Sequence, residues 1–296
     1  MRPELECASC TLKWVYERAG VLSDDEGRFT LSRCILKTLS QEFFPDVNLG
    51  LMCNKIVEST GESLAHASHY YDPFKHESNQ RAKDLLPPAK LFIDKGQTDQ
   101  ERLIRACCLA SASNIAPIGG PSETFAFHEV TNILVGKNPW PIVMGDIFEA
   151  VKKAKQVLYV TDNAGEIGFD SLLISELKEM GSRITLLVKE DPFFEDATTR
   201  DASFFQLDRE ADHLLTVKGL FVPTHCPPSL RDSLDQSDLV ISKGTGNFEA
   251  LKNELDGKKT IFMLKAKCGP IAADTGVDLG SFIVKLDQES IFPLGQ

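Results

Sequence analysis

Between residues 157 and 188 the chain reads VLYVTDNAGEIGFDSLLISELKEMGSRITLLV, in which two short apolar runs flank a longer segment with a helical pattern. The runs at 157–160 and 184–188 predict β-strands, because both are rich in Val, Leu and Ile and are bounded by turn residues. The segment 169–180 predicts a helix that Gly181 ends as its C-cap. A strand, a helix and a second strand at this spacing predict a right-handed crossover in a largely parallel sheet covered on both faces.

Four further apolar runs of the same kind follow, at 214–217, 239–242, 260–264 and 282–284. They extend the prediction to a Rossmann-like α/β domain over residues 153–296, with a doubly wound, mostly parallel sheet. Ligands of such open sheets bind outside the carboxyl ends of the strands. The residues that follow each run are therefore the candidates for a functional site.

The preceding residues, 1–152, predict a mainly helical N-terminal region. Apolar side chains recur there at helical spacing, as at Leu12, Val15 and Ala19, and no β-rich alternation of comparable length is present. Prolines punctuate this half, at Pro45, Pro73, Pro87, Pro88 and Pro117. We expect one compact body of two parts that divide near residue 152.

Composition limits the possible classes of function. The 296 residues are 42% hydrophobic, and no apolar run approaches the ~20 residues of a membrane-spanning helix. The acidic start of the chain does not resemble a secretory signal, and eight cysteines are too few for a disulfide scaffold. A cytoplasmic protein is expected, with Cys107 and Cys108 in a buried helix.

The net charge of −11 argues against a nucleic-acid partner, and a phosphate site would need local lysines or a metal ion.

The loop after the first run and the start of the next helix contain four side chains with a carboxylate or amide oxygen, in the sequence TDNAGEIGFD, residues 161–170. Asp162 and Asn163 offer a carboxylate and an amide oxygen, which suit Mg²⁺ or Mn²⁺, and Gly165 and Gly168 let backbone approach a ligand closely. The alternative interpretation is a helix N-cap, because Asp and Asn favour that position and acids favour a first turn. Spacing alone leaves both interpretations open.

The later loops add an acid and several lysines. Asp196 follows the second run and either completes a metal site or caps a helix that begins near Ala197. The sequence SKGTGNFE, residues 242–249, combines glycines, a lysine and a helix start, which fits either a phosphate site or an ordinary turn. Lys265 and Lys267 follow the fifth run. If these lysines converge with Lys243 beside a hard metal, the arrangement favours phosphoryl transfer to water.

At these residues the chain resembles the damage-control phosphatase family, long catalogued as domain of unknown function 89, in its stand-alone prokaryotic-type branch. The resemblance runs almost end to end. Its motifs are Cys7-x-x-Cys10, the Asn114 segment, Asp162-Asn163-Ala164-Gly165-Glu166 with Asp170, Asp196-Ala197-Thr198 with Asp201, Lys243-Gly244 with Asn247 and Glu249, and Lys267-Cys268.

The resemblance implies a phosphatase that hydrolyses phosphate monoesters of small metabolites, including sugar phosphates and phosphopantetheine-like compounds, in metabolite damage control. It implies a divalent cofactor, Co²⁺, Ni²⁺, Mn²⁺ or Mg²⁺, held by Asp162, Asn163 and Asp196. It also implies a set of residues that act on the phosphate ester or contact it: Asp162, Glu166, Lys243, Asn247 and Lys267 in catalysis, and Asn114, Gly244 and Glu249 in substrate binding.

One departure concerns the Asn114 segment, because the family tends to place an acid three positions later, where this chain has Pro117. This difference bears on substrate choice more than on the metal site. Two other functions stay open: an S-adenosylmethionine-dependent carboxyl methyltransferase, which no glycine-rich loop after the first strand supports, and a metabolite-binding protein without catalysis.

Four other residues have open interpretations. Cys7 and Cys10 could bind zinc, form a redox pair or lie as buried thiols on a first helix. His66 and His69 favour an exposed helix face. Trp14, Tyr16 and the phenylalanines are expected in the core.

Overall fold

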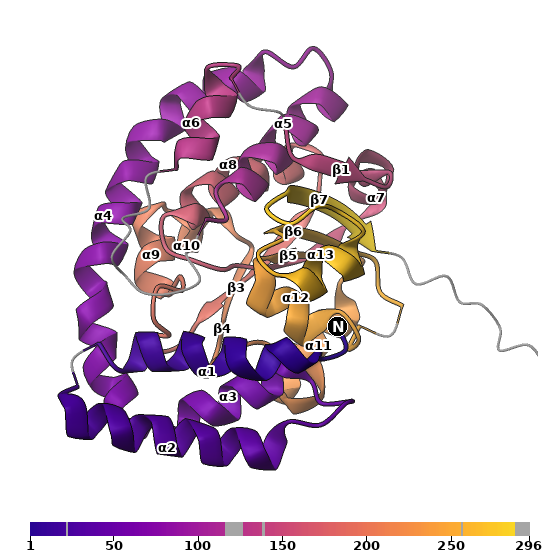
Figure 1. Ribbon diagram of the computed structural model, residues 1–296. Helices are drawn as coiled ribbons and strands as arrows, with labels where there is room; N and C mark the ends of the chain where they lie inside the picture. The colour runs from indigo at the N-terminus through magenta and orange to yellow at the C-terminus, as the bar shows by residue number, and fades with distance from the viewer. Residues whose placement is uncertain (22, 116–126, 138–139, 256, 288–296) are drawn as a thin grey trace, which may run out of the picture.

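The computed structural model describes residues 1–21, 23–115, 127–137, 140–255 and 257–287, with the backbone alone described at 62–69 (Figure 1). Among these residues one sheet has the strand order β1-β7-β6-β5-β2-β3-β4. The strands are β1 Ile142–Met144, β2 Gln156–Val160, β3 Arg183–Lys189, β4 His213–Val217, β5 Leu239–Lys243, β6 Thr260–Lys265 and β7 Phe282–Asp287. All neighbouring pairs are parallel except β6 and β7, so the predicted mostly parallel α/β sheet is confirmed.

The structure adds one strand, β1, that the sequence did not predict. β1 is only three residues long and pairs with β7 at the edge of the sheet. Two of its residues, Ile142 and Val143, are exposed. A segment this short and exposed lacks the continuous apolar run that identifies the central strands. The predicted division near residue 152 remains a prediction, but β1 already belongs to the sheet before that point.

Helices cover both faces of the sheet, as the parallel strands require. In chain order they are α1 Leu5–Ala19, α2 Asp25–Glu42, α3 Leu49–Ser59, α4 Gly61–Asp94, α5 Asp99–Ala112, α6 His128–Leu134, α7 Ile147–Lys153, α8 Glu166–Glu179, α9 Thr199–Phe204, α10 Leu207–Glu210, the 3-10 helix η1 Pro223–His225, α11 Pro228–Gln236, α12 Thr245–Leu251 and α13 Gly269–Thr275.

Alternating side chains of the strands divide the interior into two apolar cores. Along β2, Val157 and Tyr159 face the core that also contains residues of α4, α5 and α8. Leu158 and Val160 face the second core, to which α1, α2, α3, α11 and α12 contribute. The N-terminal helices therefore take part in both cores.

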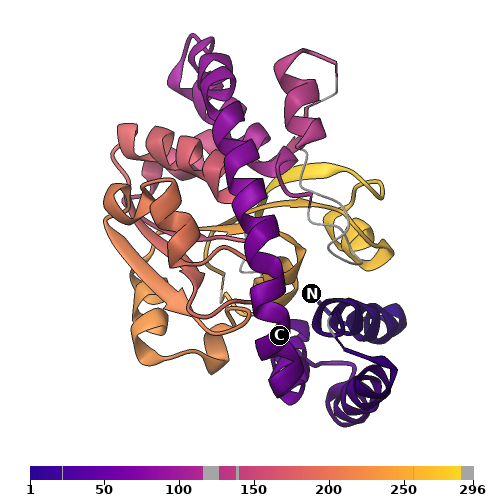
Figure 2. The same cartoon turned by 90° about the vertical axis from the view of Figure 1, so that its left-hand side faces the viewer.

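The long helix α4 corrects one sequence prediction. Pro73, Pro87 and Pro88 were expected to punctuate the N-terminal half, yet all three lie inside α4. Ala82, Ala89 and Ile93 of the same helix are fully buried, so packing against the rest of the molecule outweighs the local cost of proline. Figure 2 shows α4 running the height of the molecule. Pro117 lies outside the described residues.

The helix after β2 begins and ends close to the predicted positions. α8 begins at Glu166, and Met180 follows its last residue. Gly181 has a φ of 90°, in the left-handed region that a glycine at a helix end favours. The predicted helix 169–180 with a glycine at its end is confirmed, and the helix starts one turn earlier than predicted.

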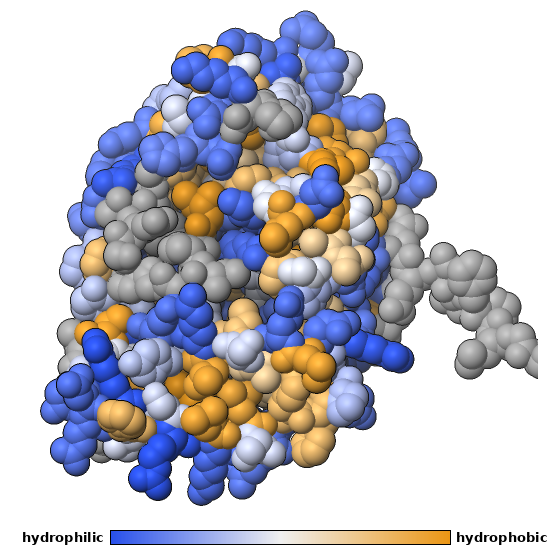
Figure 3. Space-filling model, viewed as in Figure 1, coloured by the Kyte–Doolittle hydropathy of each residue, from blue (hydrophilic) through white to orange (hydrophobic). Residues whose placement is uncertain are grey.

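Apolar side chains gather over α1 and α2 on the face shown in Figure 3. The exposed apolar residues of these two helices include Leu5, Phe29 and Leu36. No helix among the described residues is long and apolar enough to cross a membrane.

Candidate active site

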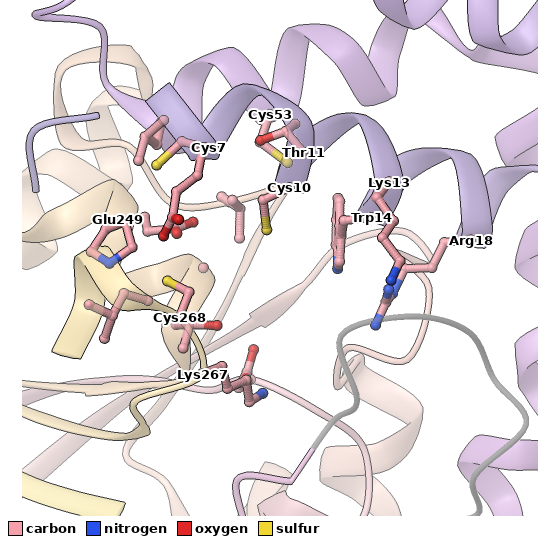
Figure 4. A pocket seen from close by; sticks show the side chains of 18 of the residues that line it. Cys7, Cys10, Thr11, Lys13, Trp14, Arg18, Cys53, Glu249, Lys267 and Cys268 are labelled. Carbon is pink, nitrogen blue, oxygen red and sulfur yellow. The ribbon is translucent and has the colours of Figure 1, made fainter. Parts of the chain in front are cut away.

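A cavity of about 540 Å³ lies at the carboxyl ends of the strands, beneath helix α1 (Figure 4). The loops after β2, β3, β5 and β6 form its floor, and α1, with Leu49 and Cys53 of α3, forms its roof. This is the edge of the sheet at which parallel α/β folds bind ligands. Its lining includes several of the predicted site residues: Asp162, Asn163, Asp196, Glu249 and Lys267.

The loop after β2 places Asp162 and Asn163 in this cavity. The N–H of Ala197 donates to the carbonyl of Asp162 at 2.7 Å, and Asn163 forms a β-bridge with Asp196. Two loops that are separate in the sequence are thereby held together. The N-cap interpretation of Asp162 and Asn163 is wrong, because the N-cap of α8 is Gly165.

Gly165 is needed where the loop meets α4. Its φ is 74°, and a Cβ at this position would lie 2.0 Å from the hydroxyl oxygen of Ser78. The N–H of Gly165 donates to the side chain of Asn79 at 2.7 Å. Any larger residue would push the loop, and with it Asp162, away from α4.

The carboxylate of Asp162 is oriented by two amides. Its Oδ2 accepts hydrogen bonds from Nδ2 of Asn114 at 2.7 Å and from Nδ2 of Asn163 at 2.9 Å. Burial raises the pKa of Asp162 above its ordinary value, while Lys267 and the hydrogen bond from Asn114 oppose that rise. Asn114 is itself fully buried and is not among the residues that line the cavity.

Asp196 does not cap the next helix, contrary to the alternative that the sequence allowed. The N-cap of α9 is Thr198, whose backbone N–H donates a hydrogen bond to the carboxylate of Asp201 at 2.8 Å. Asp196 instead lies 3.3 Å from the ammonium group of Lys189 at the end of β3. Burial raises the pKa of Asp196 to about 7, although Lys189 opposes the shift.

A second group of charges lies deeper than the cavity. The ammonium group of Lys243 is 2.7 Å from Asp170 and 3.7 Å from Glu166, and all three side chains are fully buried. Tyr159 also donates to Asp170, at 2.8 Å. Burial lowers the pKa of Lys243, but the carboxylates of Asp170 and Glu166 more than offset that effect, so its pKa lies above the ordinary value. Lys243 thus remains charged and neutralises the acids around it.

Glu166 connects this deeper group to the cavity wall. It accepts hydrogen bonds from Nδ2 of Asn114 at 3.0 Å and from Nδ2 of Asn163 at 2.8 Å. Burial raises the pKa of Glu166 to about 8 against the opposing effect of Lys243, and the charge of Asp162 adds to the rise. Asn114 and Asn163 therefore each bridge Asp162 and Glu166.

The predicted lysines occupy three different environments. Lys267 lines the cavity and makes no ion pair within the described part of the chain. Burial lowers the pKa of Lys267 below its ordinary value, while Asp162 and Glu166 oppose the decrease. Lys265 lies over the ring of Phe282, at 5.0 Å from its centroid. Lys243 lies beneath the cavity wall, as described above, so the lysines do not converge on one point.

Asn247 and Gly244 shape the wall from the side of α12. Nδ2 of Asn247 donates to the carbonyls of Thr161 and Lys243, at 2.8 Å in both cases. Its Oδ1 is buried and accepts no hydrogen bond from the residues that the structure describes. Gly244 has a φ of 82°, and a Cβ there would lie only 1.9 Å from Oδ2 of Asp162.

The donor set of Asp162, Asn163 and Asp196 fits a hard divalent cation. Asn114 and Asn163 both donate hydrogen bonds to Oδ2 of Asp162, so these bonds leave Oδ1 of Asp162 free. Asn163 donates through its Nδ2, so its own Oδ1 is also free of these bonds. Carboxylate and amide oxygens are the ligands that Mg²⁺ and Mn²⁺ prefer. This set has two carboxylates and one amide. In the described ranges no three His, Cys, Asp or Glu side chains gather as a metal-binding group.

The cysteines of the Cys7-x-x-Cys10 motif lie on α1 as free thiols. Cys7 is buried and Cys10 is exposed, so the expectation of a buried pair holds for Cys7 alone. Desolvation by the surrounding protein raises the pKa of both thiols, which disfavours the reactive thiolate form. Cys107 and Cys108 are buried in α5, as predicted. The side chains of His66 and His69 lie outside the described residues.

Sequence reasoning missed the contribution of α1. Arg18 on this helix makes a buried ion pair with Glu195, with a shortest N–O distance of 2.6 Å, and the guanidinium lies over the ring of Trp14. Trp14, expected in the core, is half-buried and lines the cavity. No local pattern marks Arg18, because its partner Glu195 lies 177 residues away in the sequence.

The chain is similar to known proteins over almost all of its length. The family model described as the damage-control phosphatase ARMT1-like domain matches residues 5–283. A protein of Archaeoglobus fulgidus named damage-control phosphatase is 32% identical over 290 residues, which cover 95% of this chain and 97% of that protein. An uncharacterised protein of Methanocaldococcus jannaschii is 27% identical over 94% of this chain and 93% of its own.

A solved structure supports the same relationship. The crystal structure of a DUF89 family protein from Pyrococcus horikoshii superposes with a TM-score of 0.79 at 25% identity. The match covers 97% of this chain and all of that chain.

Proposed function

Because the chain belongs to the damage-control phosphatase ARMT1-like family, we propose that it is a metal-dependent phosphatase that hydrolyses phosphate monoesters of small metabolites. The observation that carries the proposal is the juxtaposition of Asp162, Asn163 and Asp196 with Lys267 in one cavity at the carboxyl edge of the sheet. Sugar phosphates and phosphopantetheine-like compounds are the substrates to examine first.

The side chains of the cavity would have different roles in phosphoryl transfer to water. Asp162, Asn163 and Asp196 would hold a divalent cation, which supplies polarisation of the phosphoryl oxygens and lowers the pKa of a bound water. Lys267 lines the same cavity without an ion pair in the described structure, so its ammonium group is available for a phosphoryl oxygen. Because such groups are already oriented before the substrate binds, they need little reorganisation when charge develops in the transition state.

The buried residues behind the wall keep this arrangement in place. Asn114 and Asn163 hold Asp162 and Glu166 through hydrogen bonds of 2.7 to 3.3 Å. Lys243 neutralises Glu166 and Asp170 from below. We assign Lys243 and Asn114 to positioning, since neither side chain lines the cavity.

The proposal is tested by phosphate release from the metal-stripped protein. p-Nitrophenyl phosphate and a panel of sugar phosphates are assayed with Mg²⁺, Mn²⁺, Co²⁺ or Ni²⁺ restored, for the wild type and Asp162→Ala. We expect metal-dependent release that falls by at least about 100-fold in Asp162→Ala, as for loss of a group that acts on the transition state. Asp191→Ala is the matched control, because Asp191 follows strand β3 as Asp162 follows strand β2, but the side chain of Asp191 is 71% exposed.

Two outcomes would contradict the proposal. A folded wild-type protein that releases no phosphate with any of the four metals is not a phosphatase for these esters. Release that persists unchanged after removal of the metal, or in Asp162→Ala, would show that the reaction does not use the site described above.

A further inference from the structure

The cavity has an aromatic wall that the metal site does not use. Trp14 of α1 lines the cavity and is only half-buried. Phe193 lines the same wall, and the centroids of the two rings are 6.0 Å apart. Leu49, Leu220 and Ile271 add apolar surface to the lining. Removal of aromatic surface from water is favourable, so a ligand ring that covers the open part of the indole gains affinity.

The two faces of the indole have different surroundings. The guanidinium carbon of Arg18 lies over the ring of Trp14, at 5.1 Å from its centroid. In Figure 4, Arg18 lies on one side of the indole, and the cavity, with Cys10 beyond it, lies on the other. One face is therefore covered by a cation of the protein itself, and the other is directed into the cavity.

The contacts around the indole hold it in place before a ligand enters. Arg18 is fixed by its buried ion pair with Glu195, at a shortest N–O distance of 2.6 Å. Trp14 also packs against Phe194, with centroids 5.1 Å apart and ring planes at 83°. Phe194 is fully buried and has a φ of 53°, a strained conformation that persists only where the surrounding structure holds it. Because the ring is already ordered, a ligand that stacks on it loses little affinity to ordering.

The aromatic wall is connected to the predicted metal ligands. The segment 193–195, which contacts Trp14 and Arg18, directly precedes Asp196 in the loop after β3. Asp162 lines the same cavity as Trp14. The cavity volume of about 540 Å³ is in the range of ~300–1,000 Å³ of small-molecule sites, so a ring has room beside a phosphate group.

We propose that Trp14 is a stacking platform for the organic part of the substrate, and that the protein prefers phosphate monoesters that carry a flat, aromatic ring. The inference rests on the proposed function, since it assumes that the phosphate lies near the predicted metal ligands. Two aromatic rings gain affinity beyond the area that they bury, whereas a saturated ring of similar size gains from area alone. The ring preference is therefore the property that separates stacking from general apolar contact.

The test uses two ligands that differ only in the ring. Benzylphosphonate and cyclohexylmethylphosphonate carry the same phosphonate group on the same linker, and their carbon–phosphorus bond resists hydrolysis. Binding in the presence of Mg²⁺ or Mn²⁺ is measured by calorimetry for the wild type, Trp14→Phe and Trp14→Leu. Trp140→Leu is the matched control, because Trp140 is the other of the two tryptophans, is 41% exposed and is not among the residues that line the cavity.

For the wild type we expect benzylphosphonate to bind about 2- to 10-fold more tightly than cyclohexylmethylphosphonate, as one aromatic pair implies. Trp14→Phe should keep a preference for the aromatic ligand, because an aromatic face remains. Trp14→Leu should remove the preference, so that the two ligands bind about equally. Trp140→Leu should leave the ratio of the two affinities unchanged.

A second measurement detects the contact itself and does not depend on whether Trp14→Leu folds. Trp140→Phe leaves Trp14 as the only tryptophan of the chain. A nitrophenyl group that stacks on an indole quenches its fluorescence. In the presence of Mg²⁺, 4-nitrobenzylphosphonate should therefore quench the emission of this variant as it saturates the site, and cyclohexylmethylphosphonate should not.

Four results would each overturn the platform: equal binding of the two rings by the wild type, no binding of either with either metal, a preference that survives Trp14→Leu, and bound 4-nitrobenzylphosphonate without quenching. Phosphate release from benzyl phosphate and cyclohexylmethyl phosphate is measured separately, so the two proposals fail separately. A ring preference in binding that depends on Trp14, without phosphate release, supports the platform and refutes the phosphatase for these esters. Release without a ring preference does the reverse.

Discussion

At the residue scale, Gly244 leaves no room for a side chain beside Asp162. The φ of 82° at Gly244 suits glycine, and a Cβ would overlap the carboxylate of Asp162. Gly276 offers a matched comparison, because its φ is 75° but no atom lies within 4 Å of its virtual Cβ. The two glycines therefore separate backbone strain from displacement of Asp162.

We predict that Gly244→Ala abolishes metal-dependent phosphate release, while Gly276→Ala keeps it. Both variants should lose about 1–2 kcal/mol of unfolding free energy from left-handed strain, and Gly244→Ala should lose more because of the overlap. Denaturant unfolding and phosphate release measure the two effects. Wild-type release by Gly244→Ala would mean that Asp162 tolerates displacement or does not act.

Lys243 is the second residue whose role follows from its burial. Its ammonium group lies between Asp170 and Glu166, and all three side chains have no exposed surface. We predict that Lys243→Met lowers the unfolding free energy by roughly 3–5 kcal/mol, because two buried carboxylates lose their counter-charge. Lys218→Met, at a side chain that is 73% exposed, should change it by less than about 0.5 kcal/mol.

Denaturant unfolding at neutral pH measures both variants. The double variant Lys243→Met with Asp170→Asn should recover part of the loss, since one of the two uncompensated acids is then neutral. If Lys243→Met were as stable as the wild type, the buried group would not depend on this lysine.

Local sequence predicted the site residues that follow strands, and it missed those that come from elsewhere. The place of Asp162, Asn163 and Asp196 at the carboxyl edge of the sheet followed from the strand pattern, because strand ends meet there, but their role as metal ligands came from the family resemblance and stays a prediction. Lys189 and Arg18 were not, because their partners, Asp196 and Glu195, are brought near only by the folded chain. The depth of Lys243 was also hidden, since a lysine after a strand is ordinarily solvated.

At the element scale, a buried polar cluster joins α4 to α9. Lys75 of α4 lies 2.8 Å from Asp201, which also accepts from Nδ2 of Asn79 at 2.8 Å and from the N-cap residue Thr198. Burial alone would raise the pKa of Asp201, but Lys75 and these hydrogen bonds lower it below the ordinary value of 3.8. The ionised carboxylate therefore stabilises the packing of these two helices.

The sign of the pH dependence follows from this depressed pKa. The contribution of Asp201 is fully present above the unfolded pKa near 3.8 and is lost as the pH falls through the lower folded pKa. We predict that Asp201→Asn costs about 1.5–3 kcal/mol at pH 7. The difference from the wild type should stay constant down to about pH 4 and then shrink.

Urea unfolding between pH 7 and pH 3 measures this difference. Asp208→Asn, at an exposed residue of α10, serves as the control and should differ little from the wild type at any pH. A gap between Asp201→Asn and the wild type that grows below pH 4 would contradict the assigned sign.

Elements were predictable where one local signal was strong. The six strands β2 to β7 contain short apolar runs, and all six were predicted at their observed places. The helix α4 was not, because the prolines at 73, 87 and 88 indicate breaks that packing overrides. β1 was missed because three residues, two of them exposed, carry almost no pattern.

At the scale of the whole molecule, the helices of the first half and the strands of the second half share their cores. Leu109 of α5 is fully buried in the same core as Ile167 and Leu173 of α8 and Ile241 of β5. α5 also packs directly against β6 and β7. Two parts that share apolar cores in this way are expected to unfold together.

We predict that Leu109→Ala destabilises both halves equally, by about 2–5 kcal/mol, because the cavity it creates lies in the shared core. Hydrogen exchange followed by mass spectrometry measures the effect, by comparing the slowest amides of peptides from 1–152 with those from 153–296. Leu36→Ala, at a residue of α2 that is 51% exposed, should leave both sets unchanged. If exchange instead accelerates only within 1–152, residues 153–296 keep their stability without α5, and the division near residue 152 marks two independently folding domains.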